Sequence, residues 1–117
     1  MFKNSDDSAV KDTIDAAVEC ALACRRCAAA CLEEKNIDML RECIRLDRDC
    51  AWICDLTTSY LLGNSAFEAQ ACQLCAEICD ACAMECGKHS DMQHCVECAQ
   101  ACRECADACR TLVGAMA

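Results

Sequence analysis

The residues with the clearest chemical potential are the cysteines, which make up 17 of the 117 residues. Thiolates bind soft metals, act as nucleophiles and pair as disulfides. An odd count excludes complete pairing within one chain. Residues 1–7 show no apolar stretch typical of a secretory signal peptide, so we expect a cytoplasmic protein whose thiols stay reduced. The cysteines are therefore interpreted as free thiols or metal ligands.

Cysteine spacing alternates between three and four residues, which places the side chains on one face of each of four helices. The predicted ligands are Cys20, Cys24, Cys27, Cys31, Cys43, Cys50, Cys54, Cys72, Cys75, Cys79, Cys82, Cys86, Cys95, Cys98, Cys102, Cys105 and Cys109. Asp47 stands where the second run would have another cysteine. A small rotation of that helix would place Leu46 inward instead, and we favour this interpretation.

The elements that position these side chains are predicted from an alanine-rich, proline-free sequence with three glycines. We expect one domain over residues 1–117, with helices over residues 6–33, 37–62, 66–86 and 91–113. The predicted start and stop signals are Asp6 and Asp7, Asn36, Gly63, and two capping boxes, Ser65 with Glu68 and Ser90 with Gln93. Short connections predict an all-α, antiparallel, up-down-up-down four-helix bundle with a cysteine-lined core.

The positions of the cysteines also match between neighbouring antiparallel helices. The third and fourth runs pair at equal heights, from Cys86 with Cys95 to Cys72 with Cys109. In the first two runs, Cys31 pairs with Cys43 and Cys24 with Cys50. We therefore expect stacked layers of up to four thiols.

Charge balance favours copper(I) as the bound metal. One monovalent ion neutralises one thiolate, whereas zinc with four thiolates leaves two negative charges at every site. The expected capacity is roughly 15 to 20 copper(I) ions per chain, held for storage and detoxification and not for catalysis. Zinc or iron–sulfur binding and a thiol redox function are the alternatives. The Cys-Pro typical of ferredoxin clusters is absent, and the C-x-x-C pairs lie within helices instead of at helix N-termini.

The two ends of the bundle are predicted to differ. His89, His94, Met39 and Met92 lie near the first thiol layers and could pass ions inward, because imidazole and thioether groups bind copper. Apolar and small residues follow the stripe at the other end and predict a closed plug: Thr13, Ala17, Thr57 and Leu61, with Ile14, Tyr60, Phe67, Leu112 and Val113 nearby.

The surface is acidic, with a net charge of −9, which disfavours nucleic acid and anionic membranes as partners. No segment approaches the length of a membrane span. Trp52 lies opposite the cysteines of its helix, beside Arg45 and Arg48, and indicates a contact between subunits.

The segments RECIRLDRDCAWIC (41–54) and CGKHSDMQHCVECAQACRECADACR (86–110) resemble the cytosolic copper storage proteins. The likeness runs from about residue 15 to 112. It implies a tetramer of four-helix bundles filled with copper(I), with all seventeen cysteines as ligands and with His89 and His94 at the open mouth. Some relatives continue the cysteine stripe to positions where this chain has Ala17 and Thr13, which implies fewer ions at the plugged end.

Overall fold

The computed structural model describes residues 4–116, with side chains from residue 8 onward. It contains four long helices: α1 (Asn4–Cys31), α2 (Arg41–Leu62), α3 (Glu68–Gly87) and α4 (Gln93–Met116). A short 3₁₀ helix, η1 (Ile37–Leu40), precedes α2. The side chains of Asp6 and Asp7, which we predicted to favour the start of α1, lie outside the described residues. High helix propensity and the lack of proline explain why the helices are long and uninterrupted.

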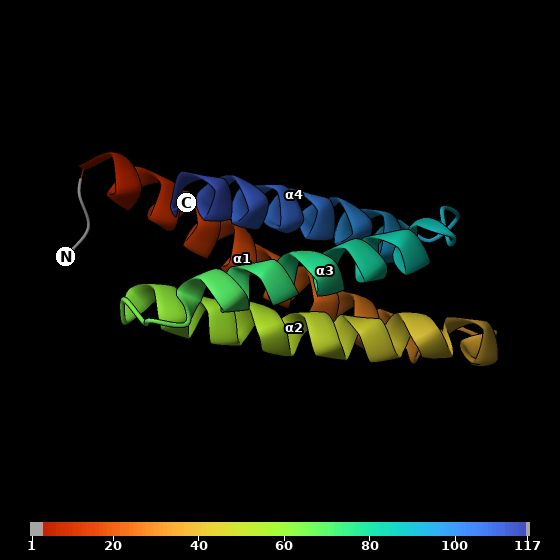
Figure 1. Cartoon of the computed structure of the whole chain (residues 1–117). Coiled ribbons are helices and arrows are strands. Elements are labelled where there is room, and N and C mark those ends of the chain that lie inside the picture. Colours follow the sequence, from red (N-terminus) through yellow and green to blue (C-terminus); the bar gives the residue numbers. More distant parts are fainter. Residues whose placement is uncertain (1–3, 117) are drawn as a thin grey trace.

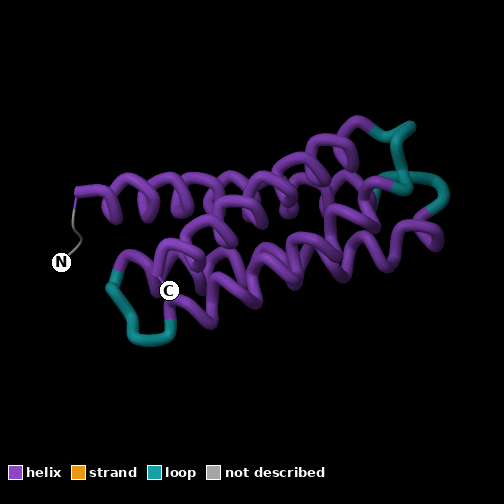
Figure 2. Tube along the Cα trace, turned by 45° about the horizontal axis from the view of Figure 1, so that its top comes forward, coloured by secondary structure: helices purple, strands orange, loops and turns teal. Residues whose placement is uncertain are grey.

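The helices form an elongated antiparallel bundle of 49 × 19 × 17 Å (Figure 1). Each helix packs against the next one in the chain, and α4 closes the ring against α1. The predicted up-down-up-down bundle is thus confirmed. The α1–α2 and α3–α4 connections, residues 32–40 and 88–92, lie together at one end, which we call the mouth end (Figure 2). The α2–α3 connection, residues 63–67, lies at the opposite end, the plug end.

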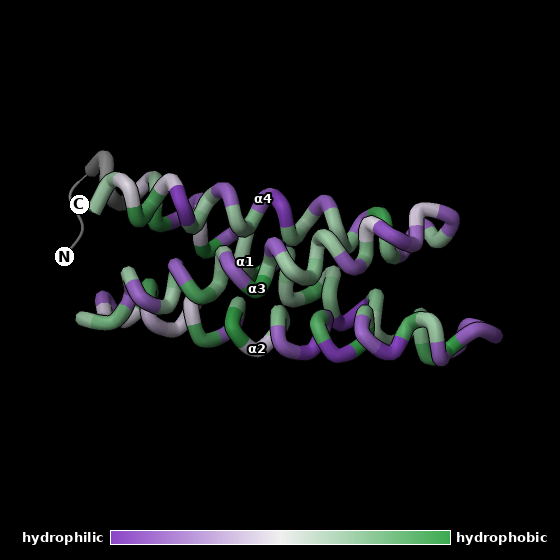
Figure 3. Tube along the Cα trace, turned by 45° about the vertical axis from the view of Figure 1, so that its right-hand side comes forward, coloured by the Kyte–Doolittle hydropathy of each residue, from purple (hydrophilic) through white to green (hydrophobic). Residues whose placement is uncertain are grey.

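Hydrophilic and hydrophobic residues alternate along every helix, as expected for helices with one buried face (Figure 3). The buried face consists mainly of cysteine and alanine. Both side chains are small, so the bundle has a narrow core in which a protonated thiol packs as an apolar group. Among residues 4–116, no helix combines the length and apolar composition needed to cross a bilayer.

The end of α2 differs from the prediction for Gly63. We expected glycine in the left-handed position after the helix, but Gly63 has φ −87° and Asn64 takes the positive angle, φ 53°. The amide N–H of Ser65 donates to the Tyr60 carbonyl at 2.9 Å, and that of Asn64 donates to the Leu61 carbonyl at 3.3 Å. These two bonds form a Schellman motif with Asn64 in the left-handed position, which asparagine tolerates.

The predicted capping boxes are wrong, and several helix ends shift. Ser65 accepts a hydrogen bond from the Phe67 amide at 3.0 Å, but its own amide already bonds to Tyr60, so Glu68 cannot complete the box. Gln93 donates to Glu97 at 3.2 Å instead of reaching back to Ser90. Consequently α3 begins at Glu68 and α4 at Gln93, each two residues later than predicted.

Other helix ends also differ from the prediction. The first helix ends at Cys31 instead of residue 33, and α4 continues past Gly114 to Met116. Asn36 precedes a 3₁₀ turn and makes no side-chain cap, so the α-helical part of the second helix starts only at Arg41.

The plug end is packed by apolar side chains and two buried hydroxyls. Leu61 is fully buried, and Thr57 donates a hydrogen bond to the Ala71 carbonyl at 3.4 Å. Thr13 satisfies its hydroxyl on the Ala9 carbonyl at 2.8 Å. Phe67 lies at this end as predicted, but it is 62% exposed because it sits in the connection before α3.

Candidate metal centre

All seventeen cysteines are buried and free, and their sulfurs come from all four helices. Each cysteine run follows the inward face of its helix, because alternating steps of three and four residues keep a side chain on one side of a 3.6-residue turn. The structure therefore brings together every cysteine that we predicted as a ligand in one continuous core.

The sulfurs form groups of four whose ligand atoms all lie within 4.8 Å of one another. Five of these groups are Cys27–Cys31–Cys43–Cys95, Cys24–Cys82–Cys98–Cys102, Cys20–Cys24–Cys50–Cys102, Cys20–Cys50–Cys54–Cys79 and Cys54–Cys75–Cys79–Cys105. The last four of these groups share members in succession; Cys20 and Cys50, for example, each belong to two of them. A thiolate shared in this way can bridge two soft ions, so the groups can hold clusters as well as isolated ions.

The groups contain the α1–α2 pairs that we predicted, Cys31 with Cys43, Cys24 with Cys50 and Cys20 with Cys54, but they are staggered, so a thiol also meets sulfurs at neighbouring heights. The Cys75 and Cys105 sulfurs, which we paired at equal height, are 3.8 Å apart. Between α1 and α2, the Cys43 sulfur lies in one group with that of Cys31 and is also 4.0 Å from that of Cys27, one step further from the mouth. The 3₁₀ segment before α2 rises about 2.0 Å per residue, against 1.5 Å in an α-helix, which moves Cys43 in this direction.

Asp47 points into the core, so our preference for Leu46 at this position is wrong. Asp47 is fully buried, whereas Leu46 is half-buried. The Asp47 Oδ1 atom accepts hydrogen bonds from the thiols of Cys82 and Cys98, both at 3.2 Å. Burial raises the pKa of the Asp47 carboxyl from its ordinary value near 3.8 to about 9. The core thus holds one carboxylic acid that is protonated at neutral pH.

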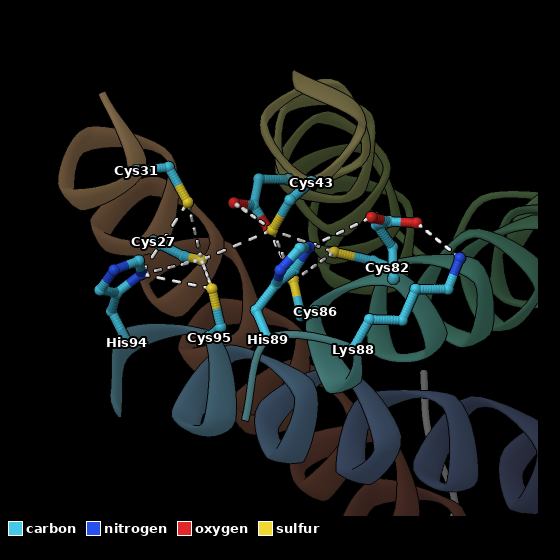
Figure 4. Close-up of polar contacts among 11 residues, drawn as sticks. Cys27, Cys31, Cys43, Cys82, Cys86, Lys88, His89, His94 and Cys95 are labelled. Carbon is cyan, nitrogen blue, oxygen red and sulfur yellow. Dashed lines mark hydrogen bonds and ion pairs between the residues drawn. The ribbon is translucent and has the colours of Figure 1, made fainter. Parts of the chain in front are cut away.

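His94 adds an imidazole nitrogen to the thiol group nearest the mouth end (Figure 4). Its Nδ1 atom lies 3.5 Å from the sulfur of Cys95, 3.6 Å from that of Cys27 and 3.9 Å from that of Cys31. The side chain of His94 is 21% exposed, whereas the three thiols are fully buried. The ring therefore stands between solvent and the first thiol group.

The other three mouth-end residues lie in different environments. His89 is nearly buried and contacts Glu85, with its Nε2 atom 3.3 Å from the carboxylate. Met92 is half-buried against the core, and Met39 is 66% exposed. Of the four residues predicted to form an entry, His94 is the one whose side chain makes hydrogen-bond contacts with thiols in the described part of the chain.

Burial also affects the thiols at the mouth end. It raises the pKa of Cys31 to about 12 and raises the pKa of Cys95 above its ordinary value. These two thiols are therefore protonated at neutral pH in the metal-free protein. Metal binding must displace their protons, because the thiolate is the ligand.

Fold and core together define a class of protein, a four-helix bundle whose interior is a store of soft-metal ligands. A family model described as copper storage protein matches residues 6–114, and the chain belongs to this family.

Solved structures of related proteins agree with this assignment. The chain is 46% identical to a Cu(I)-bound copper storage protein, BsCsp3, with a TM-score of 0.86 over 90% of this chain and 98% of that one. It is 38% identical to a cytosolic copper storage protein from Streptomyces lividans carrying five coppers, with a TM-score of 0.92 over 96% of this chain and 98% of the other. A cysteine-rich protein of Bacillus subtilis, YhjQ, is 48% identical over 87 residues, which cover 74% of this chain and 80% of the relative.

Proposed function

We propose that this chain stores copper(I) on the cysteine thiolates of its core and protects its cell from the free ion. The observation that carries the proposal is the set of buried four-sulfur groups, four of which share members in succession. Copper(I) accepts two or three sulfurs and prefers soft ligands, so it suits shared thiolates.

Proton exchange provides the charge argument. A buried thiol that loses one proton and gains one copper(I) ion keeps the net charge of the core unchanged. Filling the same groups with zinc would leave two negative charges on each independent four-thiolate site, and unpaired buried charge is costly. A store of many ions in a narrow core therefore favours a monovalent cargo.

The decisive measurement is an anaerobic titration of the reduced protein with copper(I) against a strong competing chelator. We expect roughly 15 to 20 ions per chain, since each cysteine contributes about one charge. Parallel titrations with zinc and with iron and sulfide test the alternatives. Saturation at four or fewer copper ions, or tighter retention of zinc, would contradict the storage function.

The burial of the thiols disfavours a catalytic function, because substrates in solution cannot reach them. Every cysteine is fully shielded from solvent, and reactive cysteines are partly exposed in electropositive surroundings. We infer a storage protein without catalysis, which acts in the cytoplasm, where thiols remain reduced. Turnover of a small disulfide by the metal-free protein would refute this part of the proposal.

Copper is proposed to enter at the mouth end through His94. His89 is proposed as a second residue that binds the entering ion transiently. The contact between the His94 ring and three thiols supports this route. Stopped-flow measurements should show slower uptake in His94→Ala, a smaller effect in His89→Ala, and an unchanged final capacity. Equal uptake rates in both variants and the wild type would refute the route.

The protein is further proposed to assemble as the tetramer that the sequence resemblance implies. Trp52 is 58% exposed on α2, and the Arg48 guanidinium lies 5.3 Å from the centre of its ring. Leu56, also on α2, is 41% exposed. Light scattering should show a tetramer for the wild type and a smaller species for Trp52→Glu, because a charge at a buried aromatic contact is costly. A monomeric wild type would exclude this assembly.

A further inference from the structure

Glu34 lies in the α1–α2 connection, and its side chain contacts α4 at the mouth end. Its Oε2 atom lies 3.1 Å from the Nε2 atom of His94, although 60 residues separate the two in the chain. The backbone N–H of Glu34 also donates to the Cys31 carbonyl at 3.2 Å. The carboxylate is thus anchored directly beside one of the thiols that His94 faces.

This contact determines which nitrogen of His94 is available as a ligand. A carboxylate can only accept a hydrogen bond, so the neutral ring must carry its proton on Nε2. The lone pair then lies on Nδ1, the atom that faces the sulfurs of Cys27, Cys31 and Cys95. A carboxylate bound to the far nitrogen also makes an imidazole a stronger donor and fixes the plane of the ring.

We propose that Glu34 is a positioning residue, which holds the His94 ring so that one nitrogen and three sulfurs form a preassembled first site for copper(I). This inference rests on the proposed storage function and adds to it a residue that binds no metal itself. The three thiols lie just beneath the partly exposed ring, so an arriving ion meets this donor set before the deeper groups.

The second histidine at the mouth end provides an internal comparison. His89 contacts Glu85 one turn earlier in the chain, but the other oxygen of that carboxylate is 3.1 Å from the Lys88 ammonium. Within the described part of the chain, Glu34 has no lysine or arginine partner, and no hydrogen bond joins a His89 ring nitrogen to a cysteine sulfur. The combination of an unneutralised carboxylate, an oriented ring and adjacent thiols therefore occurs at His94 and not at His89.

Three variants test the proposal: Glu34→Ala, Glu34→Gln and, as a matched control, Glu33→Ala, which alters an exposed neighbour. Loss of a carboxylate behind a metal-bound histidine typically lowers affinity about 10- to 100-fold. We expect a decrease in this range for the first copper(I) ion in Glu34→Ala, with unchanged total capacity. Glu34→Gln retains an acceptor oxygen but loses the charge, so its affinity should fall between those of the wild type and Glu34→Ala. Glu33→Ala should match the wild type.

A second readout requires no copper. Nitrogen-15 NMR of the reduced, metal-free protein should show His94 with its proton on Nε2 and with slow exchange of that proton with water. Glu34→Ala should lose the slow exchange, and Glu34→Gln should retain it. Unchanged exchange and unchanged first-ion affinity in Glu34→Ala, with circular dichroism showing a folded bundle, would overturn the proposal. If the wild type bound no copper, the storage function would fail, and the NMR measurement would still decide whether Glu34 orients the ring.

Discussion

Replacing Asp47 with asparagine should remove a pH-dependent component of the stability of the metal-free protein. The Asp47 carboxyl is fully buried among thiols, and its pKa is raised to about 9 in the folded state. In the unfolded chain it titrates near 3.8. Between these values the folded protein holds a proton that the unfolded chain has released. Asparagine is isosteric with the protonated acid and does not titrate.

The sign and size of the effect follow from proton linkage. Below about pH 4 the carboxyl is protonated in both states, so it contributes no pH dependence. As the pH rises toward 9, each unit favours the unfolded chain by about 1.4 kcal/mol. Between pH 5.5 and 7.5 the wild type should therefore lose about 3 kcal/mol of stability relative to Asp47→Asn.

Urea unfolding of reduced, metal-free protein under argon, at several pH values, measures this difference directly. Asp49→Asn is the matched control, because Asp49 is exposed on the same helix and its removal should leave the wild-type slope unchanged. Parallel pH profiles for the wild type and Asp47→Asn would show that the carboxyl titrates as in water and would refute the buried arrangement.

Three further predictions concern the plug, the shared thiols and the exchange of protons for metal. Leu61→Ala should reduce the free energy of unfolding by about 2–5 kcal/mol, because Leu61 is fully buried, whereas Leu62→Ala, at a 68% exposed position, should change it by less than about 0.5 kcal/mol in the same urea assay. Cys24→Ala/Cys102→Ala removes two thiols that belong to two groups each, so elemental analysis should show about two fewer copper ions in a protein that still folds; an unchanged capacity would show that these thiols are not ligands. Loading near neutral pH should release about one proton per ion, measured with a pH indicator dye in weak buffer, because buried protonated thiols must become thiolates; no release would mean that the metal-free core is already ionised.

The inward set of thiols could be predicted from the sequence because it depends on local geometry alone. Steps of three and four residues keep a side chain on one face of an α-helix wherever the helix lies, and short connections make neighbouring helices antiparallel. The same connectivity predicts that His89 and His94 lie at the end of the bundle where the first and third cysteine runs end and the second and fourth begin. These conclusions need no knowledge of how the helices rotate or slide against one another.

Tertiary packing decided the features that depend on rotation, height and distant contacts. Leu46 and Asp47 lie about 100° apart on α2, so periodicity near 3.5 leaves either one able to face the core, and the packing of α2 against its neighbours selects Asp47. The 3₁₀ turn before α2 influences the height of its thiols, and the structure places the Cys43 sulfur in one group with both Cys27 and Cys31. The pairing of Glu34 with His94 joins the α1–α2 connection to the first turn of α4, and no local pattern indicates it, because the contact exists only when the end of α1 and the start of α4 are brought together.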